Sequence, residues 1–249
     1  MPKRKLTLLV DADLYLFMAA SAVEIETQWG AWEWTLTANL QEAAAKFDNA
    51  VDSLMDELKG TDVIMALTDD VNWRKDVLPT YKHNRVGKRK PTCYKALRDY
   101  CAEKYRTFQR PTLEGDDVLG ILATSKKLVK GDRIVCSADK DFKTIPGQLW
   151  NGKELRTVTE AEADYAHLIQ TLTGDATDGY SGCPGIGPVK AEKALAETPG
   201  WAGVVATYGN AGLSEEAALQ QARVARICRV SDYDFKKKEV RLWAPKKQS

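Results

Sequence analysis

The sequence predicts an α/β fold with a mostly parallel central sheet flanked by helices. Short apolar runs typical of buried strands occur at 5–10, 62–67 and 133–137. Segments with helical apolar periodicity lie between and after them, the longest at 37–59. Because strands that alternate with helices build βαβ units, we expect these strands to lie parallel in one sheet.

Capping and breaker residues place the first helices. A helix is expected over 14–22, directly after the first strand. The long helix over 37–59 is predicted to begin with Thr37 as its N-cap and to end at Gly60.

The rest of the chain is predicted to be mainly helical, with one glycine-rich turn. Helices are expected at 92–108, 116–129 and 159–172. The turn covers 174–190 and leads into a helix that ends near Glu197. A last strand is expected at 239–243.

Three tryptophans, Trp29, Trp32 and Trp34, form a feature of their own. Their spacing predicts a hairpin or an insertion between the first two helices. Tryptophan rings both pack and stack on bases, and packing is the interpretation favoured here.

Composition limits the class of protein. Of 249 residues, 44% are hydrophobic and 29% charged, as in a globular chain of one large domain or two small ones. The absence of an 18-residue apolar run and of a cleavable leader predicts no membrane partner and a cytoplasmic location. Five cysteines without a C-x-x-C pair, and only two histidines, argue against a disulfide framework, a thiolate zinc site and a three-histidine centre.

The net charge of +1 conceals a segregation of charge. Residues 82–90 contain five lysines or arginines and no acid, whereas acids are clustered at 114–117 and 139–141. A chain with separate basic and acidic centres can bind a polyanion with one and metal ions with the other.

Acidic side chains follow each predicted strand of the sheet. Asp11 ends the first strand, Asp69 follows the second, and Asp139 and Asp141 follow the third. In open parallel sheets, ligands bind outside the carboxyl ends of the strands. Further acids stand three residues apart at Glu114 and Asp117 and at Asp175 and Asp178, and the full set expected in one region is Asp11, Asp69, Glu114, Asp116, Asp117, Asp139, Asp141, Asp175 and Asp178.

So many carboxylates need counter-charge. Two unit charges about 4 Å apart repel by roughly 4 kcal/mol at an effective dielectric constant near 20. All-oxygen ligands without histidine or cysteine favour Mg²⁺ or Mn²⁺, and two such ions would clamp a phosphodiester and activate water. A lone aspartate after a strand is more often a turn or cap residue, and Asp13 and Asp70 are assigned to that class.

The basic segment after the second strand suits a nucleic-acid ligand. Lys82 and Arg85 stand three apart and are expected to face the scissile phosphate, and Tyr81 to stack on a base. The alternative is a solvated basic loop. The candidate DNA contacts in this segment are Arg74, Tyr81, Lys88, Arg89 and Lys90.

The glycine-rich turn predicts a second DNA contact. Gly185 and Gly187 allow close approach of a phosphate to the backbone, and the following helix offers free N–H groups. Lys190 and Lys193 are the cations expected to accompany it.

Taken together, these motifs resemble those of the flap endonuclease / 5′-3′ exonuclease superfamily. The resemblance runs from about Leu8 to Glu197 and is most similar to the 5′-3′ exonucleases of short-tailed bacteriophages. The motifs that carry it are Val10-Asp11-Ala12, Leu78-Pro79-x-Tyr81-Lys82-x-Asn84-Arg85, Glu114-x-Asp116-Asp117, Ser137-Ala138-Asp139-Lys140-Asp141-Phe142 and Gly174-Asp175-x-x-Asp178 with Gly185-Ile186-Gly187.

The resemblance implies a PIN-like nuclease core over 1–173, with a short basic arch near 82–110, and a helix–three-turn–helix DNA-binding region with a tail over 174–249. It implies a divalent-metal-dependent enzyme that hydrolyses DNA from 5′ ends and releases 5′-phosphates, and a K⁺ ion at the turn. Its first metal would be served by Asp11, Asp69, Glu114, Asp116 and Asp117, and its second by Asp139, Asp141, Asp175 and Asp178. Lys82 and Arg85 would stabilise the scissile phosphate, and the expected partners are duplex DNA with 5′ ends or flaps and RNA–DNA hybrids, bound by a monomer.

Three alternatives stay open at this point. Only 28 residues separate Asn84 from Leu113, so any helical arch is short, which favours action on duplex ends over flap cleavage. A haloacid-dehalogenase phosphatase would explain Asp11 and Asp13 but not the other acids. A non-catalytic DNA-end-binding module would bind phosphates better without the carboxylates.

Overall fold

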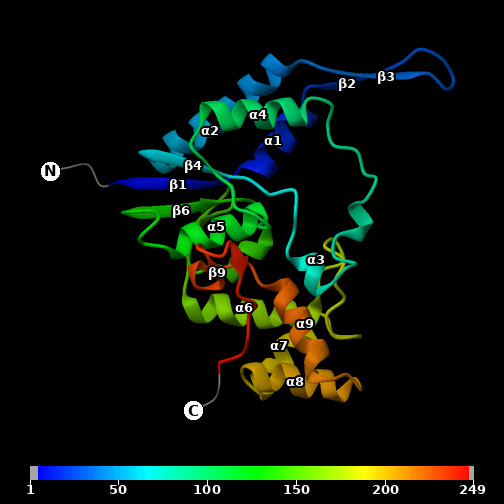
Figure 1. Cartoon of the computed structure of the whole chain (residues 1–249), viewed down its shortest axis with the longest axis vertical. Coiled ribbons are helices and arrows are strands. Elements are labelled where there is room, and N and C mark those ends of the chain that lie inside the picture. Colours follow the sequence, from blue (N-terminus) through cyan, green and yellow to red (C-terminus); the bar gives the residue numbers. More distant parts are fainter. Residues whose placement is uncertain (1–4, 247–249) are drawn as a thin grey trace.

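A six-stranded sheet is the centre of the molecule, in the strand order β5-β4-β1-β6-β7-β8 (Figure 1). The computed structural model describes residues 5–246. All pairs except the last are parallel, and β8 runs antiparallel to β7. The strands are β1 (Leu6–Asp11), β4 (Asp62–Ala66), β5 (Thr107–Phe108), β6 (Asp132–Cys136), β7 (Gly147–Trp150) and β8 (Leu155–Val158).

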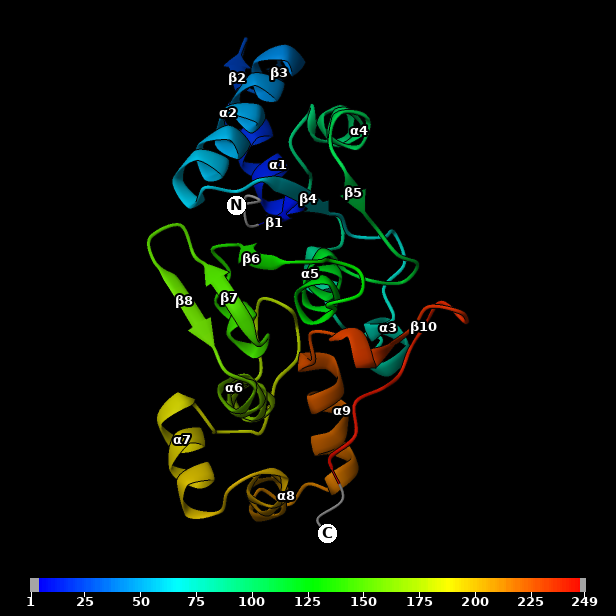
Figure 2. The same cartoon turned by 90° about the vertical axis from the view of Figure 1, so that its left-hand side faces the viewer.

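Helices cover both faces of this sheet, and Figure 2 shows the two layers. On one face lie α1 (Ala12–Ser21), α2 (Leu40–Leu58) and α4 (Tyr94–Lys104). On the other face lies α5 (Gly115–Thr124). Leu8 and Val10 of β1 point into the first layer and Leu9 into the second, which is why β1 is apolar throughout.

A third group of helices packs beyond the far edge of the sheet. It consists of α6 (Glu160–Thr173), α7 (Pro188–Glu197), α8 (Trp201–Asn210) and α9 (Glu215–Ala225). Leu172 of α6, Leu195 of α7 and Tyr208 of α8 share its apolar core. After α9 the chain returns to the sheet, where Ile227 and Cys228 pack with α5.

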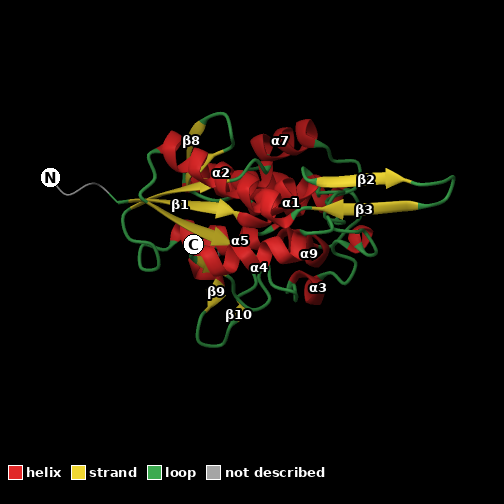
Figure 3. Ribbon diagram, turned by 90° about the horizontal axis from the view of Figure 1, so that it is seen from above, coloured by secondary structure: helices red, strands yellow, loops and turns green. Residues whose placement is uncertain are grey.

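The remaining elements are short. A two-stranded hairpin, β2 (Glu24–Gln28) with β3 (Trp34–Ala38), projects away from the sheet on the side to which β1 points (Figure 3). The others are α3 (Arg74–Val77), the 3₁₀ turns η1 (His83–Arg85), η2 (Lys140–Thr144) and η3 (Val230–Asp232), and the strand pair β9 (Tyr233–Asp234) and β10 (Glu239–Val240).

The fold class and the hairpin are confirmed, whereas several boundaries differ from the predictions. Thr37 lies in β3 and does not cap α2, because Asn39 accepts hydrogen bonds from the N–H groups of Gln41 and Glu42. Helix α5 ends at Thr124, because the backbone of Ser125 is extended. The Ser125 hydroxyl accepts a hydrogen bond from the Leu128 N–H. The segment 92–108 divides into α4 and the edge strand β5.

Two further findings concern membranes and cysteines. Within residues 5–246, no helix is both long enough and apolar enough to span a bilayer. All five cysteines are unpaired and buried, as expected for a chain without a disulfide framework.

Buried His167 makes folding stability depend on pH. Burial, together with the charge of Arg226, lowers the pKa of His167 to about 4, and its Nε2 lies 2.8 Å from the Ala222 carbonyl oxygen. Between the unfolded-state pKa of about 6.5 and the folded-state pKa of about 4, the unfolded chain binds more protons than the folded chain. The free energy of unfolding therefore decreases as the pH falls through this window.

We therefore predict that His167→Gln reduces the loss of stability between pH 6.5 and pH 4 by up to roughly 3 kcal/mol, measured by urea unfolding. His83→Gln, at an exposed histidine, is the control and leaves the pH profile unchanged. Identical pH profiles for the wild type and His167→Gln would contradict this account.

Candidate active site

Four aspartates converge at the carboxyl ends of the parallel strands. Asp11 ends β1, Asp116 lies in the first turn of α5, and Asp139 and Asp141 follow β6. Local structure fixes each one: Asp11 accepts a hydrogen bond from the Leu14 N–H at the start of α1, and Asp139 accepts from the Asp141 N–H to cap η2. The structure therefore brings these four of the predicted acids to the same end of the sheet.

Burial and repulsion between neighbouring carboxylates raise the pKa values of three aspartates in this group. Burial raises the pKa of Asp11 to about 6, opposed by a hydrogen bond from the Ser137 hydroxyl at 2.9 Å. Burial and then the charge of Asp11 raise the pKa of Asp116 well above its usual value. Burial, Asp139 and Asp175 raise the pKa of Asp141 to about 6. Raised pKa values of this kind mean that a positive charge nearby would stabilise the ionised carboxylates.

A second group of acids is already neutralised by lysine and arginine. Glu114 pairs with Lys82, whose Nζ also lies 3.4 Å from Asp178 Oδ2. Arg85 donates to the other oxygen of Asp178 at 2.6 Å. Burial opposes both charges, but the pair holds the pKa of Glu114 below its usual range and that of Lys82 above it. The predicted phosphate-facing cations thus lie beside the carboxylates, as the sequence indicates.

Arg74 and Asp117 form a buried ion pair in the interior. Arg74 is 3% exposed and Asp117 0%, and two parallel hydrogen bonds of 2.7 and 2.8 Å join them. Asp117 also accepts from the Trp73 indole N–H and the Cys228 backbone N–H. Because both oxygens are occupied, the two residues are structural in this arrangement, and Asp117 as a metal ligand and Arg74 as a DNA contact stay predictions.

Tyr81 is likewise an internal residue. It is 3% exposed, and its hydroxyl lies 2.9 Å from both Glu114 Oε2 and Asp178 Oδ2. Its ring stacks on that of Tyr180 at a centroid distance of 6.5 Å. In this arrangement the Tyr81 hydroxyl positions two acids of the site. Base stacking by Tyr81 stays a prediction, and it would require the ring to become more exposed than it is here.

Asp69 is bound to the loop before α5. Its oxygens accept from the Gln109 side chain at 3.1 Å and the Thr112 N–H at 2.9 Å, which fix the loop before α5. Asp13, assigned from sequence to the structural class, joins the end of β4 to α4, since it accepts from the Thr68 N–H and the Tyr94 hydroxyl. Both oxygens of Asp69 thus have partners in this structure, and its role as a metal ligand stays a prediction.

Two glycines shape the turn that carries Asp175 and Asp178. Gly174 and Gly182 both have positive φ, and a Cβ on either would lie about 2.3 Å from the backbone of the opposite strand of the turn. This contact closes the loop, in which Asp175 and Tyr180 exchange backbone hydrogen bonds. The Lys140 ammonium lies 3.2 Å from Asp175, although the sequence does not single out Lys140 as a site residue. Burial raises the pKa of Asp175, whereas the contact with Lys140 lowers it, and the net shift is downward.

The remaining predicted DNA contacts lie on the surface. Arg89 is bound to Glu24, and the Lys90 ammonium lies 4.5 Å from the centre of the Tyr94 ring. Gly187 is the N-cap of α7, and Gly185 has open space at its Cβ position. The other three cations, Lys88, Lys190 and Lys193, are exposed.

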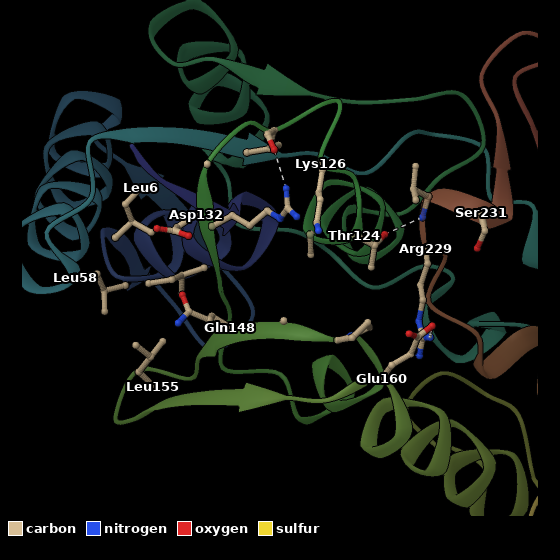
Figure 4. A pocket seen from close by; sticks show the side chains of 18 of the residues that line it. Leu6, Leu58, Thr124, Lys126, Asp132, Gln148, Leu155, Glu160, Arg229 and Ser231 are labelled. Carbon is tan, nitrogen blue, oxygen red and sulfur yellow. Dashed lines mark hydrogen bonds and ion pairs between the residues drawn. The ribbon is translucent and has the colours of Figure 1, made fainter. Parts of the chain in front are cut away.

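A pocket of about 1010 Å³ lies at the opposite end of the sheet (Figure 4). Leu6 and Asp132, the first residues of β1 and β6, line it together with Gln148 of β7. None of the predicted site residues is among its lining residues. The acidic site lies elsewhere, where Asp141 and Asp175 line a separate pocket of about 530 Å³ together with Lys140.

As they stand, the acids do not form a ready-made metal cage. Among residues 5–246, no three histidine, cysteine, aspartate or glutamate side chains are grouped so as to hold an ion. Among the acids of the second group, Lys82, Arg85 and Lys140 occupy oxygens of Glu114, Asp178 and Asp175. A divalent ion or a phosphate would have to displace these cations from their partners.

The fold and the acidic edge define the class of protein: a nuclease of the kind that the motifs predict. The model of the 5′-3′ exonuclease N-terminal resolvase-like domain matches residues 6–165. The chain therefore belongs to the 5′-3′ exonuclease family and is a 5′-3′ exonuclease / flap endonuclease-type hydrolase.

Individual relatives agree with this assignment. The exonuclease of Escherichia phage T7 is 33% identical, and the exodeoxyribonuclease of Enterobacteria phage T3 31% identical, with 96% of this chain and 93% of each relative covered. Among solved structures, a phage T5 D15 flap endonuclease complexed with DNA and metal ions superposes with a TM-score of 0.68 over 89% of each chain at 14% identity, which confirms the fold. The expected likeness to phage exonucleases is confirmed.

Substitution of Arg74 distinguishes a structural role of this residue from a contact with DNA. Arg74→Ala is expected to lower the free energy of unfolding by about 3–5 kcal/mol because it leaves Asp117 charged and unpaired. Arg74→Lys should cost less, since it keeps the charge but not the paired hydrogen bonds.

Arg85→Ala is the matched control, since the partly exposed Arg85–Asp178 pair contributes at most about 1 kcal/mol. Urea unfolding measures all three variants. Wild-type stability of Arg74→Ala combined with weakened DNA binding would return Arg74 to the phosphate contacts.

Proposed function

We propose that this chain hydrolyses phosphodiester bonds from the 5′ ends of double-stranded DNA and releases products with 5′-phosphates. The observation that carries the proposal is the group of Asp11, Asp116, Asp139 and Asp141, which gathers mutually repelling carboxylates, from buried Asp11 to exposed Asp139, at one sheet edge. Beside them, Lys82 and Arg85 supply cations for a phosphate.

The donor chemistry of the edge fits two Mg²⁺ or Mn²⁺ ions. All candidate ligands are carboxylate oxygens, and three of them have raised pKa values that a cation would relieve. Asp11, Glu114 and Asp116 would hold the first ion, and the second would be held by Asp139, Asp141, Asp175 and Asp178. Bound divalent ions would activate water and neutralise the charge of the phosphodiester.

Lys82 is placed to exchange one anionic partner for another. Its ammonium lies between Glu114 and Asp178, so a phosphate entering this edge offers it oxygen atoms in their place. The exchange would position the phosphate and free the two carboxylates. The Tyr81 hydroxyl is hydrogen-bonded to the same two acids and helps to fix their positions.

Duplex ends are favoured over threaded flaps as substrate. The segment 86–92 contains no helix, and α4 packs into the core through Leu97 and Cys101 and forms no free arch. The alternative is structure-specific cleavage of 5′ flaps, as the names of the flap endonucleases Xni of Shewanella suggest at 25–29% identity. Degradation of the RNA strand of RNA–DNA hybrids is a further activity that we include in the proposal.

The turn at 174–187 and α7 would contact the duplex beyond the active site. Gly185, Gly187, Lys190 and Lys193 present open backbone and cations there. Lys190 Nζ donates to the Gly185 carbonyl at 2.9 Å, so a K⁺ ion at the backbone oxygens of this turn would compete with an ammonium. We propose residues 1–173 as the nuclease core and 174–249 as the DNA-binding region of a protein that acts as a monomer in the host cytoplasm.

Digestion of end-labelled duplex DNA tests the proposal. With Mg²⁺, we expect rapid release of short 5′-labelled products with 5′-phosphates and late release of the 3′ label. Asp139→Asn is expected to abolish cleavage and to retain duplex binding in EDTA.

Cleavage only at a branched junction would replace the exonuclease by a flap endonuclease. Early release of the 3′ label, or full activity of Asp139→Asn, would contradict the proposed site.

A further inference from the structure

The hairpin β2–β3 exposes three tryptophans that no part of the fold covers. Trp29 is 70% exposed, Trp32 94% and Trp34 52%, and Ile25 is exposed beside them. The interpretation that these tryptophans pack in the interior is wrong. Large aromatic side chains held in water on a projecting element indicate a contact surface.

The aromatic side chains are not gathered on one face of the hairpin. Gln28 pairs with Trp34, so these two share a face. Trp29 lies on the opposite face, where its indole N–H donates to the Thr35 hydroxyl at 2.8 Å. Trp32 stands in the connecting loop at the tip. A flat protein surface would bury one continuous face of the hairpin. Aromatic side chains on both faces and at the tip are better suited to stacking on the bases of a nucleic acid.

The hairpin is joined to the basic segment of the nuclease face. The Arg89 guanidinium makes two hydrogen bonds of 2.7 Å to Glu24 at the base of the hairpin. The backbone N–H and the hydroxyl of Thr92 donate to the same carboxylate. The loop 86–92, which carries Lys88 and Lys90, is therefore fixed against the hairpin, and cations and aromatics stand side by side. This combination is typical of single-strand and DNA-end contacts.

The hairpin lies on the same side of the sheet as the acidic edge. Helix α1 starts beside Asp11 and leads directly to β2, and a ten-residue helix is about 15 Å long. That length corresponds to about four base pairs at 3.4 Å each. Figures 1 and 3 both show the hairpin projecting on the side to which β1 points, where the acidic edge lies.

Charge decides which part of the nucleic acid the hairpin can touch. Beyond Glu24, it carries Glu26 and Glu33 and no lysine or arginine. Acids repel phosphates, so the hairpin does not track the backbone, and the faces of bases remain as the partner for its rings. The loop 86–92 is left to contact the phosphates.

We propose that the β2–β3 hairpin is a base-stacking element, in which Trp32 stacks on the exposed base at an end of the bound DNA and Trp29 and Trp34 flank it. The inference rests on the proposed function, since it requires that DNA ends be bound at the acidic edge. It adds a binding site that lies outside the carboxylates and the glycine-rich turn.

The test is DNA-end binding in EDTA, which separates binding from cleavage. The probe is a short duplex with 2-aminopurine in its terminal pair, compared with closed circular duplex, which has no ends. Trp32→Ala is expected to weaken binding to the short duplex at least about fivefold and to remove the fluorescence change of 2-aminopurine. Its affinity for the closed circle should equal that of the wild type.

Three comparisons make the result specific. Trp32→Phe keeps a stacking ring and should retain most of the affinity, whereas Trp32→Leu, which is apolar but not aromatic, should behave like Trp32→Ala. Phe235→Ala removes an exposed aromatic from the β9–β10 turn and should bind as the wild type does.

The outcomes separate the two proposals. Equal affinity and equal fluorescence for Trp32→Ala and the wild type would overturn the stacking proposal and leave the nuclease intact, with the hairpin assigned to a protein partner. Absence of DNA binding by the wild type itself would overturn the proposed function as well.

Discussion

Repulsion among carboxylates at one edge of the sheet is the constraint on which the rest of the structure depends. The protein resolves it in two ways. Two buried acids form ion pairs with cations: Asp117 with Arg74, and Glu114 with Lys82. Asp11, Asp116 and Asp141 are left without enough positive charge, and burial raises the pKa of each. The division separates residues that stabilise the fold from residues that we propose as ligands of a divalent cation.

The Arg74–Asp117 pair also organises the chain around the site. Arg74 donates to the carbonyl oxygens of Val224 and Arg226, and Asp117 accepts from the Cys228 N–H. One ion pair thus joins α3 and α5 to the segment after α9. Since the helices α6–α9 begin and end against the core, the glycine-rich turn is held beside the acids. A buried pair with all its hydrogen bonds made can have this organising effect even where its net stabilisation is small.

The sequence was sufficient for the fold class and for the acidic edge because both depend on local patterns. Apolar strands that end in aspartate identify themselves by periodicity and position, and a parallel sheet brings their ends together. What the sequence did not reveal was the choice of partner. Asp116 and Asp117 are neighbours of the same type, yet the helix turns one toward Asp11 and the other toward Arg74. Tyr81 and the hairpin tryptophans show the same limit, since exposure depends on packing at a distance: the tyrosine is buried and the tryptophans are not.

The neighbouring pair Asp116 and Asp117 offers the most direct measurement of this account, which is the melting temperature of Asp116→Asn and Asp117→Asn at pH 7 with and without Mg²⁺. Asp116→Asn removes an uncompensated charge, so it should melt above the wild type without metal and lack the stabilisation that we expect Mg²⁺ to give the wild type. Asp117→Asn should melt well below the wild type, since it breaks the ion pair with Arg74. An Asp116→Asn variant that melts lower without metal, or that keeps the full response to Mg²⁺, would contradict the claim that this edge is built around unpaired negative charge.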